Sequence, residues 1–181
     1  MAFNLVVATG WRQERQCMEE LYKIGDMLAR RVEDVWFTGF DGLITAQVEG
    51  DPFEFTRGLA DLVSSGYYVP RYVLRATPIM VVVKTDLDEV AKAAAELAER
   101  YIASHESFKI ELRKRGVKYD RLAVIDYVAK GINRKVNLTS PDKYLWLEMF
   151  PSRTGLSVMR EGDNFSLMRT KVGHGGGNNN S

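Results

Sequence analysis

The feature that most constrains the fold is the stretch at residues 108–116, which reads Phe-Lys-Ile-Glu-Leu-Arg-Lys-Arg-Gly. Apolar and charged residues alternate in its first half, which is typical of a strand with one face packed inward and one face in solvent. Three consecutive cations then precede Gly116, a residue that accepts a positive φ in a turn. The pattern predicts a strand that ends in a basic turn.

A helix is expected directly after this turn. Asp120 is a candidate N-cap, and the helix would extend to about Asn133. The residues expected on its buried side are Leu122, Ile125, Ala129 and Ile132. Lys130 and Arg134 lie one turn apart and are expected to face solvent. The turn at 140–143 then leads into a second apolar strand at 144–150.

The N-terminal part predicts a small mixed unit of its own. Strands are expected at residues 3–8, 35–38, 43–48 and 71–76, and helices at 13–31 and 51–66. Asp51, Pro52 and Glu54 have the spacing of an N-cap, a first-turn proline and a capping box. The order β-α-β-β-α-β is that of a ferredoxin-like split βαβ unit.

Further elements are expected after residue 78. These are a strand at 79–84, a helix that begins at Thr85, and strands at 155–160 and 165–168. The glycine- and asparagine-rich residues 173–181 are expected to be disordered. The predicted domains are therefore residues 1–80, residues 81–172 and a tail.

Charge is distributed unevenly along the chain. Residues 1–104 carry 11 Lys/Arg against 16 Asp/Glu, and residues 105–181 carry 14 against 8. The balances of −5 and +6 add up to the net charge of +1. An excess of cations in one half favours a polyanion-binding surface there.

The order of these segments resembles the THUMP domain, an RNA-binding module of tRNA-modifying enzymes. The resemblance covers residues 85–160 approximately and rests on the basic turn, the helix after it, and three short motifs. These motifs are Val136-Asn137-Leu138, Pro141-Asp142-Lys143 and Trp146-Leu147-Glu148. It implies an α+β fold with an N-terminal ferredoxin-like domain followed by a THUMP α/β domain.

The resemblance also implies a function. THUMP domains with a preceding ferredoxin-like domain recognise the acceptor end of tRNA, and a chain of this length has no room for the usual catalytic domain. It resembles the stand-alone type of THUMP protein that assists tRNA cytidine N4-acetylation. We therefore expect a non-catalytic adaptor whose partners are tRNA and a tRNA acetyltransferase.

The candidate RNA-binding residues are cations of the second half, because each cation that meets a phosphate releases condensed counterions. They are Lys109, Arg113, Lys114, Arg115, Lys118, Lys130, Arg134, Lys135, Lys143 and Arg153. Tyr119 and Tyr144 could stack on unpaired bases, whereas core packing is expected for Tyr127.

No catalytic constellation is predicted. His105 is expected at a helix end, without the converging partners that a triad requires. Cys17 is expected as a small core residue rather than a reactive thiol. Nothing in the pattern predicts a cofactor or a metal site. Thr9-Gly10-Trp11 lies between a strand and a helix and is either a plain turn or an anion site.

Three alternatives stay open. The chain is a protein-interaction subunit whose basic face meets an acidic partner, a detached RNA-binding part of a THUMP-type tRNA-modifying enzyme, or a small hydrolase on a ferredoxin-like scaffold. No apolar run approaches the roughly 18 residues of a membrane span, and no signal peptide is recognised, so a cytoplasmic location is expected.

Overall fold

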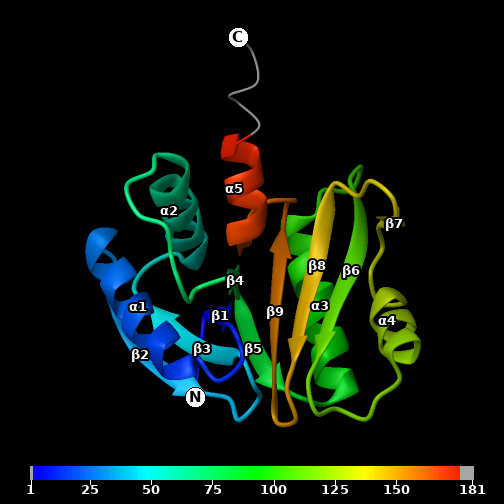
Figure 1. Ribbon diagram of the computed structural model, residues 1–181. Helices are drawn as coiled ribbons and strands as arrows, with labels where there is room; N and C mark the ends of the chain where they lie inside the picture. The colour runs from blue at the N-terminus through cyan, green and yellow to red at the C-terminus, as the bar shows by residue number, and fades with distance from the viewer. Residues whose placement is uncertain (1, 176–181) are drawn as a thin grey trace. The chain divides into compact units, whose positions relative to one another are not determined.

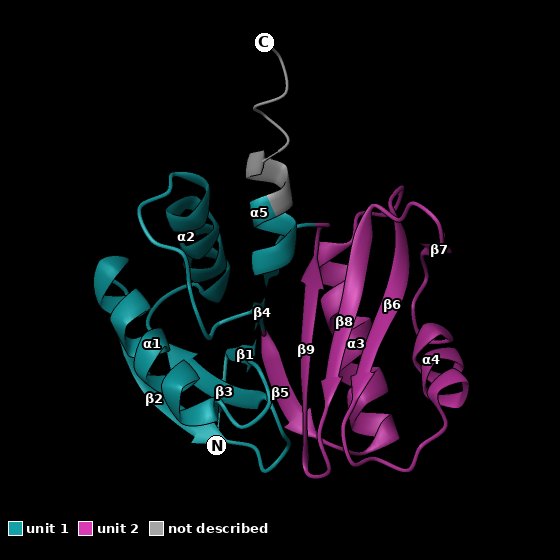
Figure 2. Cartoon of the chain, viewed as in Figure 1, with its two compact units in different colours: residues 1–78, 162–181 teal, residues 79–161 magenta. Residues whose placement is uncertain are grey.

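The computed structural model describes residues 2–175 of the chain (Figure 1). The chain divides into two compact units, residues 1–78 with 162–181, and residues 79–161 (Figure 2). No helix within residues 2–175 is long and apolar enough to cross a membrane.

The first unit is built on one antiparallel sheet. Its elements are β1 (Leu5–Ala8), α1 (Glu14–Met27), β2 (Val32–Phe37), β3 (Leu43–Val48), α2 (Pro52–Ser64), β4 (Arg75–Pro78), β10 (Phe165–Ser166) and α5 (Leu167–Gly175). The strand order is β10-β4-β1-β3-β2. The six elements from β1 to β4 follow the predicted β-α-β-β-α-β order, which is the ferredoxin-like arrangement.

The start of α2 shows how local sequence sets an element boundary. Asp51 Oδ1 accepts a hydrogen bond from Phe53 N at 2.9 Å, and Pro52 occupies the first helical position, as predicted. The predicted capping box is wrong, because the Glu54 carboxylate pairs with Arg30 instead.

The loop before β4 is held by a buried carboxylate rather than by strand pairing. Glu20 of α1 accepts hydrogen bonds from Tyr68 Oη and from the backbone N–H groups of Arg71, Tyr72 and Val73, all at 2.8–2.9 Å. These bonds satisfy N–H groups that a strand would have paired. Strand β4 consequently begins at Arg75, later than the expected strand at 71–76.

The C-terminal segment belongs to the first unit, whereas the sequence placed residues up to 172 with the second domain. Phe165 pairs with Ala76 of β4 and is fully buried in the first core. Thr56 Oγ1 also donates to the Asp163 carbonyl at 2.8 Å. The expected strand at 165–168 is only two residues long and continues into α5. The expected disordered tail overlaps the end of α5, and residues 176–181 lie outside the described residues.

The second unit contains a mixed sheet. Its elements are β5 (Val81–Lys84), α3 (Leu87–Tyr101), β6 (Ser107–Lys114), α4 (Arg121–Ala129), β7 (Lys135–Val136), β8 (Lys143–Met149) and β9 (Arg153–Met159). The strand order is β5-β9-β8-β6-β7, with β6 parallel to both β7 and β8. Helices α3 and α4 pack on one face of this sheet through a shared core (Figure 1).

Helix α4 differs from its prediction in length and in orientation. It ends at Ala129, and its fully buried residues are Val124 and Val128. Leu122, expected on the buried side, is 68% exposed. Residues 124 and 128 lie one turn apart and face α3 and β6, so they are the pair that fills the core.

Candidate nucleic-acid interface

Strand β6 has the predicted alternation. Phe108, Ile110 and Leu112 are buried against the helices, while Lys109, Glu111 and Arg113 face the other side of the sheet. After the strand, Arg115 N donates to the Met149 carbonyl at 2.9 Å, which continues the pairing with β8 into the turn.

The turn ends at the N-terminus of α4. Gly116 has φ +65, as a turn glycine can, and Asp120 Oδ2 accepts from Ala123 N at 3.0 Å. The predicted order of strand, basic turn and capped helix is therefore confirmed.

Strand register brings several cations to one edge of the sheet. Lys84 at the end of β5 lies opposite Arg153 at the start of β9, and Lys114 lies opposite Met149 at the end of β8. Lys118 is exposed in the turn that follows β6. We call Lys84, Lys114, Arg115, Lys118 and Arg153 the carboxyl-edge cluster, because it lies where β5, β6 and β8 end.

The N-termini of α3 and α4 lie at this same edge, since each helix follows a strand that ends there. Helix N-termini carry partial positive charge, which favours anions nearby. Acids are also present, because Asp86 and Asp88 lie at the start of α3. Asp88 accepts a hydrogen bond from Tyr127, and this bond raises the pKa of the Tyr127 hydroxyl. Tyr127, expected in the core, is exposed.

Two of the predicted cations support a buried acid and an aromatic ring. Glu148 has a side chain only 3% exposed and pairs with Arg115. It also accepts from Trp146 Nε1 at 2.9 Å. The Arg113 guanidinium lies 5.4 Å from the centre of the Trp146 ring and 3.4 Å from Glu111. Both arginines therefore have partners within the unit, which lowers the charge that they offer to a ligand.

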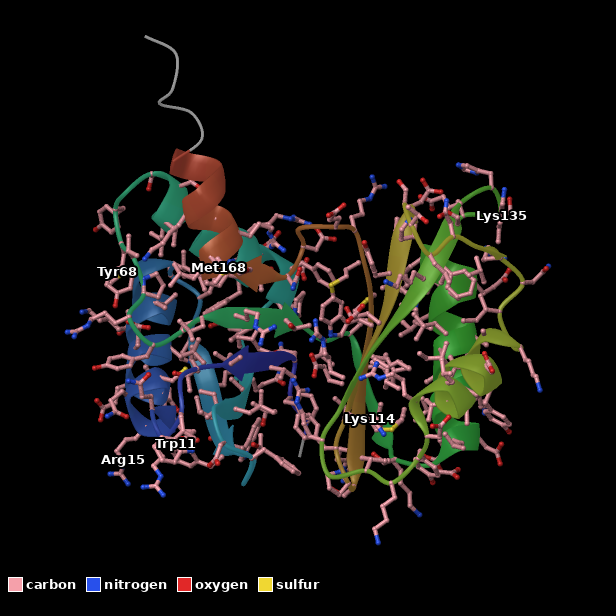
Figure 3. The ribbon with its side chains drawn as sticks, turned by 45° about the vertical axis from the view of Figure 1, so that its right-hand side comes forward. Trp11, Arg15, Tyr68, Lys114, Lys135 and Met168 are labelled. Carbon is pink, nitrogen blue, oxygen red and sulfur yellow. The ribbon has the colours of Figure 1, made fainter. Side chains whose placement is uncertain are left out.

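The remaining predicted cations lie toward the other end of the sheet or along it. Lys135 pairs with Ser107 at the start of β6, whereas Lys114 lies at its end, as Figure 3 shows. With a rise of ~3.3 Å per residue, the two ends of β6 are roughly 23 Å apart. Lys130 is exposed at the C-cap of α4, and Lys109 lies in the second residue pair of β6 and β8. The structure thus does not gather all ten residues into one cluster.

Arg134 and Lys143 form hydrogen bonds within the second unit rather than facing solvent. Arg134 Nε donates to the Ile102 carbonyl at 2.7 Å, and its side chain is only 8% exposed. Lys143 Nζ donates to the Tyr101 carbonyl at 2.9 Å and to Glu106 at 3.0 Å. The expectation that Arg134 faces solvent is wrong, because its side chain ties the end of α3 to the segment after α4.

The Pro141-Asp142-Lys143 motif also forms hydrogen bonds within the second unit. Asp142 Oδ2 accepts from Ser107 N at 2.8 Å and from Ser107 Oγ at 3.2 Å. The backbone hydrogen bond from Ser107 is the main reason that the pKa of Asp142 lies below its ordinary value. The motif therefore fixes the start of β8 beside the start of β6.

Lys84 is the member of the carboxyl-edge cluster that the sequence prediction omitted. The signal that could have found it is its position as the first charged residue after the apolar run of β5, directly before the acidic start of α3. Among the residues that the structure describes, Lys84, Lys118 and Arg153 are exposed and have no ion pair with a carboxylate.

Cys17 and His105 do not belong to the carboxyl-edge cluster. Cys17 is fully buried in the first unit, and burial raises the pKa of its thiol to about 12. His105 is exposed between α3 and β6. Within the described part of the chain, no group of three or more His, Cys, Asp or Glu residues is placed to hold a metal ion.

Comparisons with known proteins bear on both units. PH1313 from Pyrococcus horikoshii Ot3 has 16% identity and a TM-score of 0.65 over 91% of this chain and 55% of its own. TrmN from Thermus thermophilus has 15% identity and a TM-score of 0.62 over 93% and 48%. A 4-thiouridine synthetase, solved with RNA and bound ATP, has 14% identity and a TM-score of 0.55 over 88% and 42%.

These structures share the fold of this chain, which spans about half of their length. No curated protein matched the sequence. The THUMP domain profile matches residues 84–159, which all belong to the second unit. The resemblance that the sequence motifs indicated is thereby confirmed, and residues 84–159 of this chain form a THUMP domain.

Proposed function

We propose that this protein binds tRNA through the carboxyl-edge cluster of its THUMP domain and presents it to a separate modification enzyme. The observation that carries the proposal is that the matched THUMP segment coincides with the unit that has this basic edge. The shared fold with a 4-thiouridine synthetase that was solved with RNA supports the choice of ligand.

The carboxyl edge suits a phosphate backbone better than the opposite edge does. Its exposed cations lie beside two helix N-termini, and both features attract anions. At the opposite edge, Lys130 and Lys135 are exposed, but Arg134 and Lys143 are used by carbonyl and carboxylate groups of the unit. The C-terminal ends of α3 and α4 lie there and carry partial negative charge.

Recognition of this kind depends on the shape of the RNA more than on its sequence. A-form helices have a deep major groove that side chains do not read, and their phosphates and 2′-hydroxyls present the accessible features. Charged side chains at the end of a rigid sheet match such a backbone without base contacts. The protein is therefore proposed to bind many tRNAs.

The proposed role is that of a non-catalytic adaptor, and the partner is a tRNA acetyltransferase that forms N4-acetylcytidine. The layout of a ferredoxin-like unit with a THUMP domain supports this choice of reaction through its resemblance to the stand-alone THUMP proteins. Nucleoside analysis of tRNA from cells that lack the gene tests it. N4-acetylcytidine is expected to disappear, and its retention with loss of a different modified nucleoside would assign another reaction.

The tRNA binding is tested with purified tRNA and with variants in which three cationic side chains are replaced by alanine. The variant with Lys84→Ala, Lys118→Ala and Arg153→Ala is expected to bind tRNA more weakly than the unchanged protein. A matched variant with Lys92→Ala, Lys130→Ala and Lys135→Ala loses the same charge elsewhere on the unit. Equal losses in the two variants would contradict an interface at the carboxyl edge.

A further inference from the structure

A hollow of about 410 Å³ lies in the first unit, between the β1–α1 loop and the β2–β3 turn. Its walls are formed by Arg12, Glu14, Arg15, Phe37, Thr38, Gly39, Phe40, Asp41 and Leu43. None of these residues belongs to the carboxyl-edge cluster. The hollow is therefore a separate candidate site, and its lining combines aromatic rings with arginines.

Hydrogen bonds within the unit fix the turn that forms one wall. Thr38 Oγ1 accepts from Phe40 N at 3.1 Å and donates to the Leu43 carbonyl at 2.9 Å. Gly42, with φ +71, approaches the neighbouring loop so closely that a Cβ atom would lie 2.7 Å from the Thr9 carbonyl oxygen. A wall held in this way is formed before any ligand arrives.

The Phe37 side chain offers an aromatic surface. Phe37 pairs with Ile44, a core residue, so its ring lies on the face of the sheet that α1 covers. Phe37 is nevertheless 54% exposed. An exposed ring beside a preformed hollow is a stacking platform for a planar group.

Arg12 is held at the rim of the hollow. Its guanidinium lies 4.3 Å from the centre of the Trp11 ring, and Trp11 Nε1 donates to Asp41 at 3.3 Å. Arg12 has φ +59, which is uncommon for a residue other than glycine. The backbone conformation and the stacked ring together orient the Arg12 side chain.

Arg15, in the first turn of α1, supplies a second cation of the lining (Figure 3). Within the described residues it has no ion pair with a carboxylate. The hollow also contains two carboxylates. Glu14 accepts from Gly42 N at 2.8 Å, and its pKa is lowered chiefly by this bond and to a smaller degree by the Arg12 charge, while Asp41 accepts from Trp11 Nε1 at 3.3 Å. Among the described residues neither Arg12 nor Arg15 forms an ion pair with a carboxylate, so both guanidinium groups keep hydrogen-bond donors for a phosphate.

We propose that this hollow binds an unpaired nucleotide of the RNA, with its base stacked on Phe37 and its phosphate between Arg12 and Arg15. A planar ring and a phosphate are the two groups that this lining fits, because aromatic rings stack bases of any sequence and arginine forks bind phosphate oxygens. The inference rests on the proposed RNA binding and adds a second site on the first unit.

The test compares two RNA hairpins, one blunt and one with a short single-stranded tail. Stacking of one base contributes enough for the tail to increase the affinity of the unchanged protein about ten-fold. Phe37→Ala and Arg15→Ala are each expected to remove this gain and to leave the affinity for the blunt hairpin unchanged. Tyr67→Ala and Arg57→Ala are matched controls, because both residues are exposed in the first unit and lie outside the hollow.

The outcomes separate this inference from the proposed function. If the tail adds no affinity while the blunt hairpin binds, the nucleotide site is overturned and the THUMP interface is retained. If neither hairpin binds, the proposed function fails as well. A third arm uses free adenosine monophosphate. Binding of this mononucleotide that depends on Phe37, with no effect of the tail, would assign the hollow to a free nucleotide and contradict the inference.

Discussion

At the scale of single residues, buried acids determine much of the local structure. Glu20 is buried, and its two carboxylate oxygens accept four hydrogen bonds from the loop before β4. A carboxylate has no donor, so it matches a set of four donors that an amide could not match.

We expect Glu20→Gln to destabilise the first unit. The amide nitrogen would face two donors, and leaving buried polar groups unpaired costs about 1–3 kcal/mol for each group. The free energy of unfolding, measured with urea, is expected to fall by about 2 kcal/mol or more. Glu19→Gln, on the exposed side of the same helix, serves as the control. An equal change in both variants would contradict this account of the loop.

A second residue-scale prediction concerns Arg115 and Glu148. Arg115→Ala leaves the buried carboxylate of Glu148 without its cation, which costs about 3 kcal/mol in comparable buried pairs. The double variant Arg115→Ala with Glu148→Gln removes the charge that is left unpaired and is expected to recover part of this stability. If thermal unfolding of the single variant matches that of Lys118→Ala, the pair has no structural role.

The difference between cations with partners inside the unit and exposed cations explains why sequence alone could not select the cations of the proposed RNA interface. Arg134 and Lys118 are equally charged in the sequence, yet the Arg134 side chain is only 8% exposed and donates to the Ile102 carbonyl, whereas Lys118 is exposed. The sequence does not indicate Lys84, because its neighbour Arg153 lies far away in the sequence and is brought beside it only by the pairing of β5 with β9.

At the scale of elements, hydrogen bonds tie the turn before β8 to the start of the neighbouring parallel strand β6. Asp142 accepts two hydrogen bonds from Ser107, and Asp142 N donates to Ser107 Oγ at 3.2 Å. Parallel strands lack a direct hairpin connection, so side-chain bonds of this kind fix where β8 begins relative to β6.

A pH dependence follows from this turn. The pKa of Asp142 is lowered in the folded protein from its ordinary value of 3.8, chiefly by the backbone hydrogen bond from Ser107. Its contribution to stability is therefore complete above pH 3.8 and is lost as the pH falls through the lower folded value. The difference in stability between the unchanged protein and Asp142→Asn should narrow below pH 3.8. A difference that stays constant over this range would contradict the assignment.

Elements with strong local signals were predicted well. The strand at 43–48 has its predicted limits, and α2 begins at the predicted proline. Helix α4 was predicted poorly, because several apolar residues surround its axis and only the contacts with α3 and β6 select the buried ones. The position of β10 was not predictable either, since its pairing with β4 joins residues that are far apart in the sequence.

At the scale of the whole molecule, the excess of cations is different when it is counted by compact unit instead of by half of the chain. Residues 79–161 carry 15 Lys/Arg against 12 Asp/Glu, a balance of +3, whereas the other residues carry 10 against 12. The excess in the THUMP-containing unit is thus smaller than the +6 of the C-terminal half. The proposed RNA interface therefore depends on the position of the exposed cations rather than on net charge.

The most direct measurement of the central claim is the salt dependence of tRNA affinity. For the unchanged protein, the logarithm of the binding constant should fall steeply and linearly with the logarithm of salt concentration. Each phosphate contact contributes roughly 0.7–0.9 to this slope, so removing Lys84, Lys118 and Arg153 should reduce it by about 2 to 3. An unchanged slope in that variant, with tRNA binding retained, would contradict the proposed interface.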